Sequence, residues 1–408
     1  MRMDFHIQPN SGQANPVDKM PLLPTQRHLF DIPEDIAYFN CASNSPLLIE
    51  SQKRLIGGIA LKSHPWQIKP INFFKDAETI RTLAAGIFGS DADGYAVIPA
   101  ASYGFSAAAR AIEPHLQKGD VIVLMAEEFP SNVLTWKRIA QEKGILIRTV
   151  PVPPDGNWTQ AIIDHLDEKV KVLSLSTCHW MYSAYVDIAT IRKAAHANCI
   201  CMVDATQTLG AMPFPLEESK PDFLIAAGYK WLMSPYGFGL MYVAPEWRNA
   251  RPLEETWLAR ENAENFSTLA DYSDTYLPGA RRFDMGEKCI STILPGAIAA
   301  LEQIQAWGVQ RISNTLARIN QQMAVRLASL GFRLADVQLR CPHLFGANLP
   351  VHYKGNLVNE LSERNIYVSQ RGRGIRFAPH LHVNEQDINR LLETIEELVK
   401  HNLSVNIR

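Results

Sequence analysis

The feature that most constrains the fold is a regular alternation of short apolar segments with helix-like segments between about residues 50 and 245. The apolar segments are predicted strands, at 95–99, 121–125, 145–152, 170–176, 199–205, 222–227 and 239–244. Helices are predicted between them, through Ala111, over 131–143, near 158–168 and over 187–197. Strands that alternate with helices form parallel units, and continuously apolar strands fit a sheet covered on both faces. The sequence therefore predicts an α/β fold with a mostly parallel seven-stranded sheet.

Beyond residue 290 the pattern changes and predicts a smaller α+β domain. Helices are expected over 293–306, 310–330, 355–364 and 384–400, and strands over 331–337, 347–353 and 366–369. We expect a large domain over 50–290 and a small one over 291–408. Residues 1–19 are polar and predict a flexible arm, whereas 20–49 are expected to pack on the small domain.

Composition narrows the class of protein. The chain has 408 residues, 47% of them hydrophobic, and a formal net charge of -2. This balance gives no basic stripe, so we expect no nucleic-acid partner. No apolar run approaches the roughly 20 residues of a membrane span, and the N-terminus lacks the apolar stretch of a signal peptide. The 6 cysteines form no CxxC pair, so we expect reduced thiols in a cytoplasmic protein and no metal site.

Two charged residues follow predicted strands at the edge where open α/β sheets bind ligands. Asp204 ends an apolar strand, where a carboxylate needs a cation such as a protonated pyridinium nitrogen. The alternative is an aspartate that caps the next turn. Lys230 follows the strand at 222–227 in apolar surroundings, which lower a lysine's pKa and make it a nucleophile toward carbonyl groups. The alternative is a lysine that extends to solvent at a strand end.

A third segment, residues 97–112, runs from a strand into a helix start. Ala101, Ser102 and Tyr103 would present free backbone N–H groups there, a cradle for phosphate that the helix dipole strengthens. The alternative is a helix capped by a serine. The order of the three segments, a phosphate-type turn followed by Asp204 and then by Lys230, favours the functional interpretation.

The motifs VDATQTLG (203–210) and GYKWL (228–232) then identify a resemblance. The chain resembles the class V aminotransferases of pyridoxal-phosphate (PLP) fold type I, which include cysteine desulfurases, selenocysteine lyases and isopenicillin-N-epimerase-like proteins. The resemblance extends from YFNCASNSP (38–46) to the C-terminal helix. It implies PLP as the cofactor, a small amino acid as the substrate, and a homodimer with the active site at the subunit interface.

The resemblance also implies a role for each matching residue. Lys230 would form the internal aldimine with PLP, and Asp204 would pair with the pyridine nitrogen. Gln207 would hydrogen-bond the phenolic oxygen, and Phe129 would stack on the pyridine ring. Arg376 would bind the substrate α-carboxylate as a bidentate fork, with a surface arginine as the alternative.

The sequence departs from the family pattern at several positions. Trp180 replaces an asparagine of desulfurases and is expected to shape the pocket, with His179 beside it as a secondary candidate. Tyr229 and Ala227 replace a histidine and a serine that contact phosphate, and only Tyr229 keeps a hydroxyl group. Glu287 replaces a threonine that reaches the partner's phosphate, which puts a phosphate role at that position in doubt.

The reaction is constrained by a missing cysteine. Desulfurases carry a nucleophilic cysteine in the loop before the substrate arginine, but residues 368–375 have none and Cys341 comes too early. The leading hypothesis is therefore an aminotransferase-like enzyme that is not a cysteine desulfurase. A PLP-dependent lyase, an epimerase or racemase, and a non-catalytic PLP-binding protein are the alternatives. Arg371 and Arg373 either select an acidic side chain or belong to a solvated loop.

Overall fold

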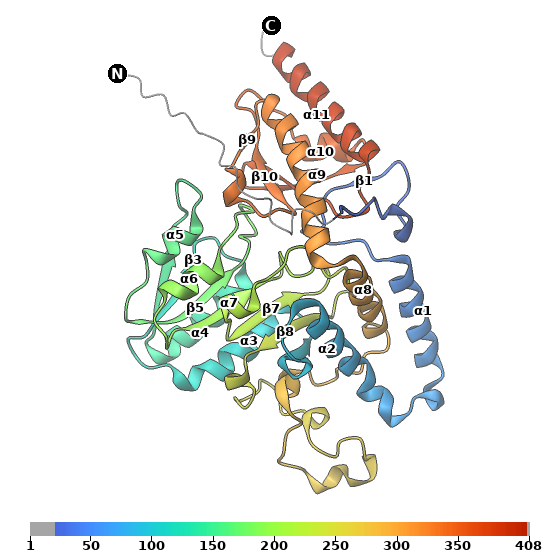
Figure 1. Ribbon diagram of the computed structural model, residues 1–408, viewed down its shortest axis with the longest axis vertical. Helices are drawn as coiled ribbons and strands as arrows, with labels where there is room; N and C mark the ends of the chain where they lie inside the picture. Colours follow the sequence, from blue (N-terminus) through green and yellow to red (C-terminus); the bar gives the residue numbers. More distant parts are fainter. Residues whose placement is uncertain (1–20, 406–408) are drawn as a thin grey trace.

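The structure, a computed structural model, describes residues 21–405 and contains a seven-stranded sheet (Figure 1). The strands are β2 (Tyr95–Ile98), β3 (Val121–Met125), β4 (Leu146–Val150), β5 (Val170–Ser176), β6 (Ile200–Asp204), β7 (Phe223–Ala227) and β8 (Gly239–Val243), in the spatial order β2-β8-β7-β6-β5-β3-β4. The pairs from β7 to β4 are parallel, and β8 is antiparallel to both of its neighbours. Only a loop joins β7 to β8, so β8 must return antiparallel. The predicted mostly parallel sheet is confirmed.

Helices cover this sheet and pack beside it. They are α1 (Ile49–Ser63), α2 (Lys75–Phe88), α3 (Ala101–Ile112), α4 (Pro130–Lys143), α5 (Trp158–Ile163), α6 (Ile188–Ala194), α7 (Leu216–Ser219) and α8 (Leu294–Trp307). Both α1 and α2 pack against α8 (Figure 1). The predicted helix near 158–168 is shorter than expected, because the chain turns at Asp164. The sequence pattern did not single out α1 and α2.

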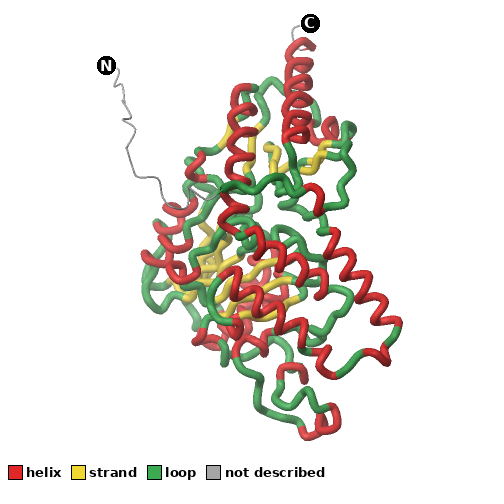
Figure 2. The backbone as a smooth tube through the Cα atoms, turned by 45° about the vertical axis from the view of Figure 1, so that its right-hand side comes forward, coloured by secondary structure: helices red, strands yellow, loops and turns green. Residues whose placement is uncertain are grey.

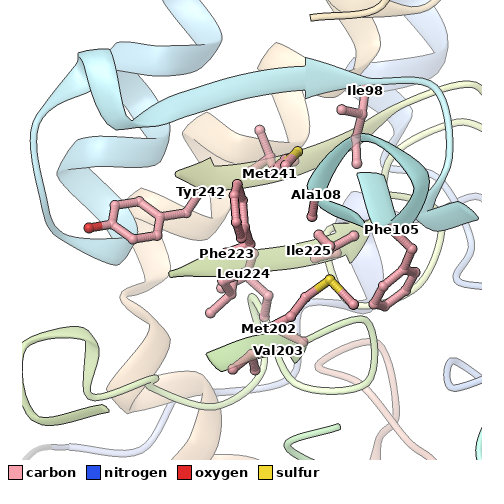
Figure 3. Packing of buried hydrophobic residues seen from close by; sticks show 14 of the residues in the cluster. Ile98, Phe105, Ala108, Met202, Val203, Phe223, Leu224, Ile225, Met241 and Tyr242 are labelled. Atoms are coloured by element: carbon pink, nitrogen blue, oxygen red, sulfur yellow. The ribbon is translucent and has the colours of Figure 1, made fainter. Parts of the chain in front are cut away.

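The core lies between the sheet and its helices. Figure 3 shows Ile225 of β7 beside Phe105 and Ala108 of α3, with Ile98 of β2 at the same face. All four side chains are buried. This packing fixes α3 against the sheet, and the start of α3 therefore lies beside the carboxyl ends of the parallel strands.

A second, smaller core surrounds a four-stranded sheet (Figure 1). Its strands run in the order β12 (Ser369–Arg371), β13 (Gly374–Phe377), β10 (Phe345–Asn348) and β9 (Arg333–Leu334), and its helices are α9 (Val309–Ser329), α10 (Leu357–Ser362) and α11 (Glu385–Val405). The predicted strand 331–337 reduces to two residues. The predicted strand 347–353 was wrong beyond Asn348, since Pro350 cannot donate to a ladder and begins a turn that Tyr353 closes. Strand β13 was not predicted from the sequence.

The segment before α1 contacts both cores. Its strand β1 (Ala37–Tyr38) pairs in parallel with β11 (Ile366–Tyr367), and Phe39 belongs to the smaller core. Cys41 and Leu48 belong to the larger core. The segment thus packs on more than the small domain alone. The predicted arm, residues 1–19, lies outside the described residues, and the domain boundaries stay a prediction. Within residues 21–405, no helix has the length and apolar character needed to cross a membrane.

Between β8 and α8 the chain projects from the body of the molecule in short 3-10 turns, including η8 (Trp257–Ala259) and η9 (Phe266–Asp271) (Figure 2). A buried ion network lies near its base. Asp284 accepts from Arg81, and Lys288 donates to Asp284 Oδ2 at 2.7 Å. Asp284 Oδ1 also accepts from the backbone of Val97 at 2.9 Å, which ties the end of the projection to β2.

Candidate active site

A cavity of about 230 Å³ lies at the carboxyl ends of β5, β6 and β7. The predicted site residues that line it are Ala101, Ser102, Phe129, Trp180, Asp204, Gln207, Tyr229 and Lys230. Tyr103 and Arg376 are not among its lining residues. A larger cavity of about 650 Å³ lies under the projecting segment, but it is lined by residues 255–274 and contains none of the predicted site residues. The smaller cavity is therefore the candidate active site.

Lys230 is almost completely buried in this cavity. Burial lowers the pKa of its amino group to about 8, against the opposing influence of the Asp204 carboxylate. The turn that carries Lys230 requires Gly228, because a Cβ atom there would lie 2.7 Å from the carbonyl oxygen of Phe238. The free-base form of Lys230 is thus accessible near neutral pH, as a nucleophilic lysine requires.

Asp204 ends β6 and lies in the same cavity as Lys230. Its Oδ1 accepts a hydrogen bond from the backbone of Thr206 at 2.8 Å. Burial nevertheless raises the pKa of this carboxyl group above its ordinary value. A cationic group bound in the cavity would reverse that shift and stabilise the ionised form.

Glu128 is a second buried carboxyl group in the cavity, and it was not predicted from the sequence. Its Oε1 accepts from the backbone of Phe129 at 2.7 Å, whereas its Oε2 has no partner among the described residues. Burial first, and then the nearby Asp204, raise the pKa of Glu128 to about 7. The only signal in the sequence was its place directly before Phe129, in the EEFPSN segment.

Two side chains of the wall are largely committed to structural hydrogen bonds. The indole of Trp180 donates to the carbonyl of Glu127 at 2.8 Å, so it cannot also donate to a ligand. The amide of Gln207 donates to the carbonyl of Ala42 and accepts from the indole of Trp231, each at 3.0 Å. An amide nitrogen carries two hydrogens, so Gln207 keeps one for a ligand oxygen.

Aromatic rings flank Lys230. Its Nζ lies 5.5 Å from the centroid of the Phe129 ring and 5.7 Å from that of Tyr229. Phe129 meets Trp180 edge to face, and Tyr229 stacks on Tyr236 with their centroids 4.0 Å apart. These contacts hold flat apolar surfaces next to the amino group.

The N-terminus of α3 opens onto the cavity. Its cap residue, Ala100, makes no side-chain cap, and the first N–H groups of a helix have no partner within it. Ala101 and Ser102 line the cavity, but the Tyr103 hydroxyl donates to the carbonyl of Asp284 at 3.2 Å. The backbone of this turn fits an anion, whereas the Tyr103 side chain belongs to another contact.

Arg376 and Arg371 converge beside the cavity. Nη2 of each guanidinium donates to Oγ of Ser43, at 2.8 Å from Arg376 and 3.2 Å from Arg371. Nη1 of Arg376 donates to the carbonyl of Trp180, which lines the cavity. Burial first, and then the proximity of Arg371, lower the pKa of Arg376 to about 9. Arg373, in the adjacent turn, is exposed.

The remaining candidates lie apart from the cavity. His179 is buried, stacks on Trp158 with a centroid distance of 4.7 Å, and bonds through Nε2 to the carbonyl of Ala126, which is a structural role. Burial lowers its pKa. Glu287 is exposed and lines a different cavity, near Lys62.

One thiol, Cys178, lines the cavity and was not predicted to do so. It is buried, and Cys341 contacts it from the segment after α9. Burial and this contact raise the pKa of the Cys341 thiol well above its ordinary value, so Cys341 is a poor nucleophile.

This donor set fits PLP, a flat aromatic aldehyde that carries a phosphate and a basic ring nitrogen. Lys230 would be the nucleophile for the aldehyde, Asp204 the partner of the ring nitrogen, and Phe129 an aromatic wall for the ring. The start of α3 would take the phosphate, and the spare hydrogen of Gln207 would meet the phenolic oxygen.

Comparisons with known proteins agree with this fit. Residues 71–390 match the family model named Aminotransferase class-V. An uncharacterized aminotransferase of Schizosaccharomyces pombe is 26% identical over 391 residues, which cover 91% of this chain and 94% of that protein. Isopenicillin N epimerase of Amycolatopsis lactamdurans is 25% identical over 349 residues, 79% of this chain and 85% of that protein. The solved structure of a mutant of C-DES, with glycine covalently linked to its PLP cofactor, superposes with a TM-score of 0.79 at 19% identity, over 91% of this chain and 98% of that one.

Proposed function

We propose that this chain, which belongs to the class V aminotransferase family, is an aminotransferase that acts on a small amino acid with Lys230 as its catalytic residue. The family is PLP-dependent, so the chain is a PLP-dependent enzyme. The observation that carries the proposal is the placement of Lys230, whose pKa burial lowers to about 8, in one cavity with Asp204.

The cofactor, when bound, supplies an electron sink that acidifies the α-carbon of an amino-acid substrate. Asp204 would hold the pyridine nitrogen protonated, because an ionised carboxylate at that depth favours a cationic partner. Lys230 would then take the α-proton on Nζ and return it to a neighbouring carbon. Arg376 would hold the substrate carboxylate, since it contacts the Trp180 wall of the cavity.

The departures from the family pattern shape the environment of this lysine. Trp180, with its indole committed to Glu127, closes one side of the cavity without donating to the ligand. Phe129 offers a ring face but no exchangeable proton, which leaves Lys230 as the proton carrier on its side. Tyr229 and Tyr236 line the same cavity as the helix turn at Ala101 and Ser102.

Desulfuration is not favoured, because residues 368–375 contain no cysteine. The thiol that does line the cavity, Cys178, is 1% exposed and lies two residues after the end of β5, so a mobile loop does not present it to the substrate. A lyase or an epimerase would use the same lysine and the same acidified carbon. Product analysis separates the three reactions. An aminotransferase gives a keto acid and an aminated acceptor, a lyase releases a leaving group, and an epimerase gives a substrate of inverted configuration.

The direct test is to load the purified protein with PLP and reduce it with borohydride. We expect a stable adduct that peptide mass mapping places on Lys230, together with a visible absorbance band before reduction. Lys230→Ala should lose both signals. Lys220→Ala is a matched control, since Lys220 follows α7 and does not line the cavity. An adduct on another lysine, or none, would overturn the proposal.

A homodimer and a cytoplasmic location are further parts of this proposal. The outer side of α1 supports an interface, because Ile56 and Ile59 are 67% and 56% exposed and share one face of the helix. Light scattering should give twice the mass of one chain, and Ile56→Asp with Ile59→Asp should lower it. A monomeric wild-type protein would contradict the dimer. The six thiols, none of them in a disulfide, support a reducing compartment.

A further inference from the structure

The two arginines beside the cavity form a pair of like charges. Arg371 ends β12 and Arg376 lies in β13, which pairs with it antiparallel so that Arg371 faces Gly374. Side chains alternate along a strand, so Arg371, Gly374 and Arg376 share one face of this hairpin. Gly374 has no side chain, so it places nothing between the two guanidinium groups. They meet at the single hydroxyl oxygen of Ser43.

No carboxylate of the described residues forms an ion pair with either guanidinium. The oxygens that they contact are neutral: the Ser43 hydroxyl and the carbonyls of Trp180 and Gln370. The Nε atoms of Arg371 and Arg376 are buried without a partner. Arg376 is fully buried and Arg371 partly buried, and the burial of unpaired cations is costly unless an anion joins them.

Arg81, the other fully buried arginine of the described residues, shows the contrast, and so does the partly buried Arg281. Arg81 pairs with Asp284, and Arg281 pairs with Glu78 and Asp93. Each of these guanidinium groups has its carboxylate within the protein. The absence of an internal carboxylate at Arg371 and Arg376 therefore leaves their charge available to a bound anion.

The pair also lies beside the cavity that contains Lys230. The guanidinium carbon of Arg371 is 5.6 Å from the centroid of the Trp180 ring, and Arg376 donates to the backbone of the same residue. Trp180 lines the cavity of Lys230. Both arginines are close enough to Lys230 to contribute to the lowering of its pKa.

We propose that the substrate is an amino acid with a second anionic group on its side chain, whose α-carboxylate Arg376 binds and whose side-chain anion Arg371 binds. This inference rests on the proposed function. An α-carboxylate alone would neutralise one guanidinium and leave the other as an uncompensated charge next to it. A dicarboxylic substrate compensates both, and bidentate contacts of arginine with carboxylate suit each end.

The test measures binding of unreactive ligands to the PLP-loaded protein by titration calorimetry. The probes are matched pairs of equal length: succinate against butyrate, and glutarate against pentanoate. In the wild-type protein one of the two dicarboxylates should bind at least about 10-fold more tightly than its monocarboxylate, as one extra charge-assisted contact gives. Failure of both dicarboxylates to bind more tightly would overturn the inference.

Three variants assign the contacts. Arg371→Gln should remove the preference for the dicarboxylate and change monocarboxylate affinity less than about 3-fold. Arg376→Lys should weaken both members of a pair, because lysine cannot form the fork. Arg373→Gln, an exposed neighbour in the same hairpin turn, is the matched control and should change neither affinity. If Arg371→Gln weakens both members equally, the two arginines clamp a single carboxylate and the inference is wrong.

The result of this ligand-binding test can be distinguished from the result of the test of the proposed function. Covalent loading of Lys230 with PLP is measured first, in each variant, with thermal melting as the check on folding. A protein that does not load contradicts the proposed function. A protein that loads on Lys230 but shows no preference between the paired ligands contradicts only the assignment of the substrate class.

Discussion

The side-chain nitrogen of Lys230 lies 5.5 Å from the centroid of the Phe129 ring. The lysine follows β7, whereas the phenylalanine is the N-cap of α4, so two separate elements hold the amino group and the aromatic wall next to it. Phe129 is 36% exposed, and part of its ring is therefore open to a ligand.

We expect Phe129→Leu to weaken PLP binding by about 3- to 10-fold, because a stacked ring contributes roughly 0.5–1.5 kcal/mol beyond its buried area. Phe129→Tyr keeps the ring and should bind PLP as the wild type does. Absorbance titration of the protein with PLP measures both constants. An equal loss of PLP affinity in the two variants would show that the ring does not stack on the cofactor.

Loading with PLP should depend on pH through Lys230. Burial lowers the pKa of its amino group to about 8, and only the free base attacks an aldehyde. The rate of adduct formation should therefore rise with pH up to about 8 and level off above it. Stopped-flow absorbance at a series of pH values gives the profile. A midpoint near the ordinary lysine value would show that burial does not govern this group.

Asp284 should be critical for stability. Its pKa is lowered despite burial, because Arg81 and Lys288 surround the carboxylate. Asp284→Asn leaves Lys288 without a charged partner and Arg81 with only the partly exposed Glu78, and should cost about 3–5 kcal/mol in the free energy of unfolding. Arg138→Gln, which breaks an exposed pair with Glu142, is the control and should cost at most about 1 kcal/mol.

The Asp284 carboxylate should also make the stability of the protein depend on pH in a definite direction. A folded pKa below the unfolded value means that the unfolded state takes up the proton first as the pH falls. The contribution of Asp284 is thus present at neutral pH and is lost in acid, below the ordinary pKa of an aspartate. In denaturant titrations the difference in the free energy of unfolding between wild type and Asp284→Asn should become smaller in this acid range. A difference in the free energy of unfolding that stays constant into acid would show that Asp284 does not cause this pH dependence.

Three buried histidines should add a second acid sensitivity. Burial lowers the pKa of His343 and His380 to about 3 and that of His382 to about 4. Since an unfolded histidine titrates near 6.5, stability should fall as the pH drops below about 6.5.

His380 is the residue to change, because neither of its ring nitrogens has a partner among the described residues. Its ring packs near Trp231 and Trp307, so His380→Phe keeps an aromatic group there. The melting temperature of this variant should drop less between neutral pH and pH about 5 than that of the wild type. Exposed His64→Phe is the control. Identical drops in wild type and His380→Phe would refute the role of this histidine.

The large sheet was predictable because its strands are short, apolar and separated by helices. Asp204 and Lys230 were predictable because each follows such a strand, and strand ends meet at one edge. The segment after β10 was not predictable, because residues 347–353 have the pattern of a strand but contain Pro350.

Contacts between distant segments account for what the sequence did not show in the site. Ser43 joins Arg371 and Arg376 from a segment more than 300 positions earlier in the chain. Glu128 and Cys178 are single residues of common types, and only the folded structure shows that they line the same cavity. The sequence pattern around a residue does not show which distant residues lie beside it in the fold.

The segment before α1 has a consequence for how the protein is made. Its Ser45 donates to the carbonyl of Tyr229, its Ala42 accepts from Gln207, and its Cys41 donates to the carbonyl of Ala378. This segment leaves the ribosome before every strand of the large sheet, but Ala378 and the β11 strand that pairs with β1 emerge after all of them. The pocket is therefore completed only after Ala378 has emerged, and a shorter nascent chain has no finished site.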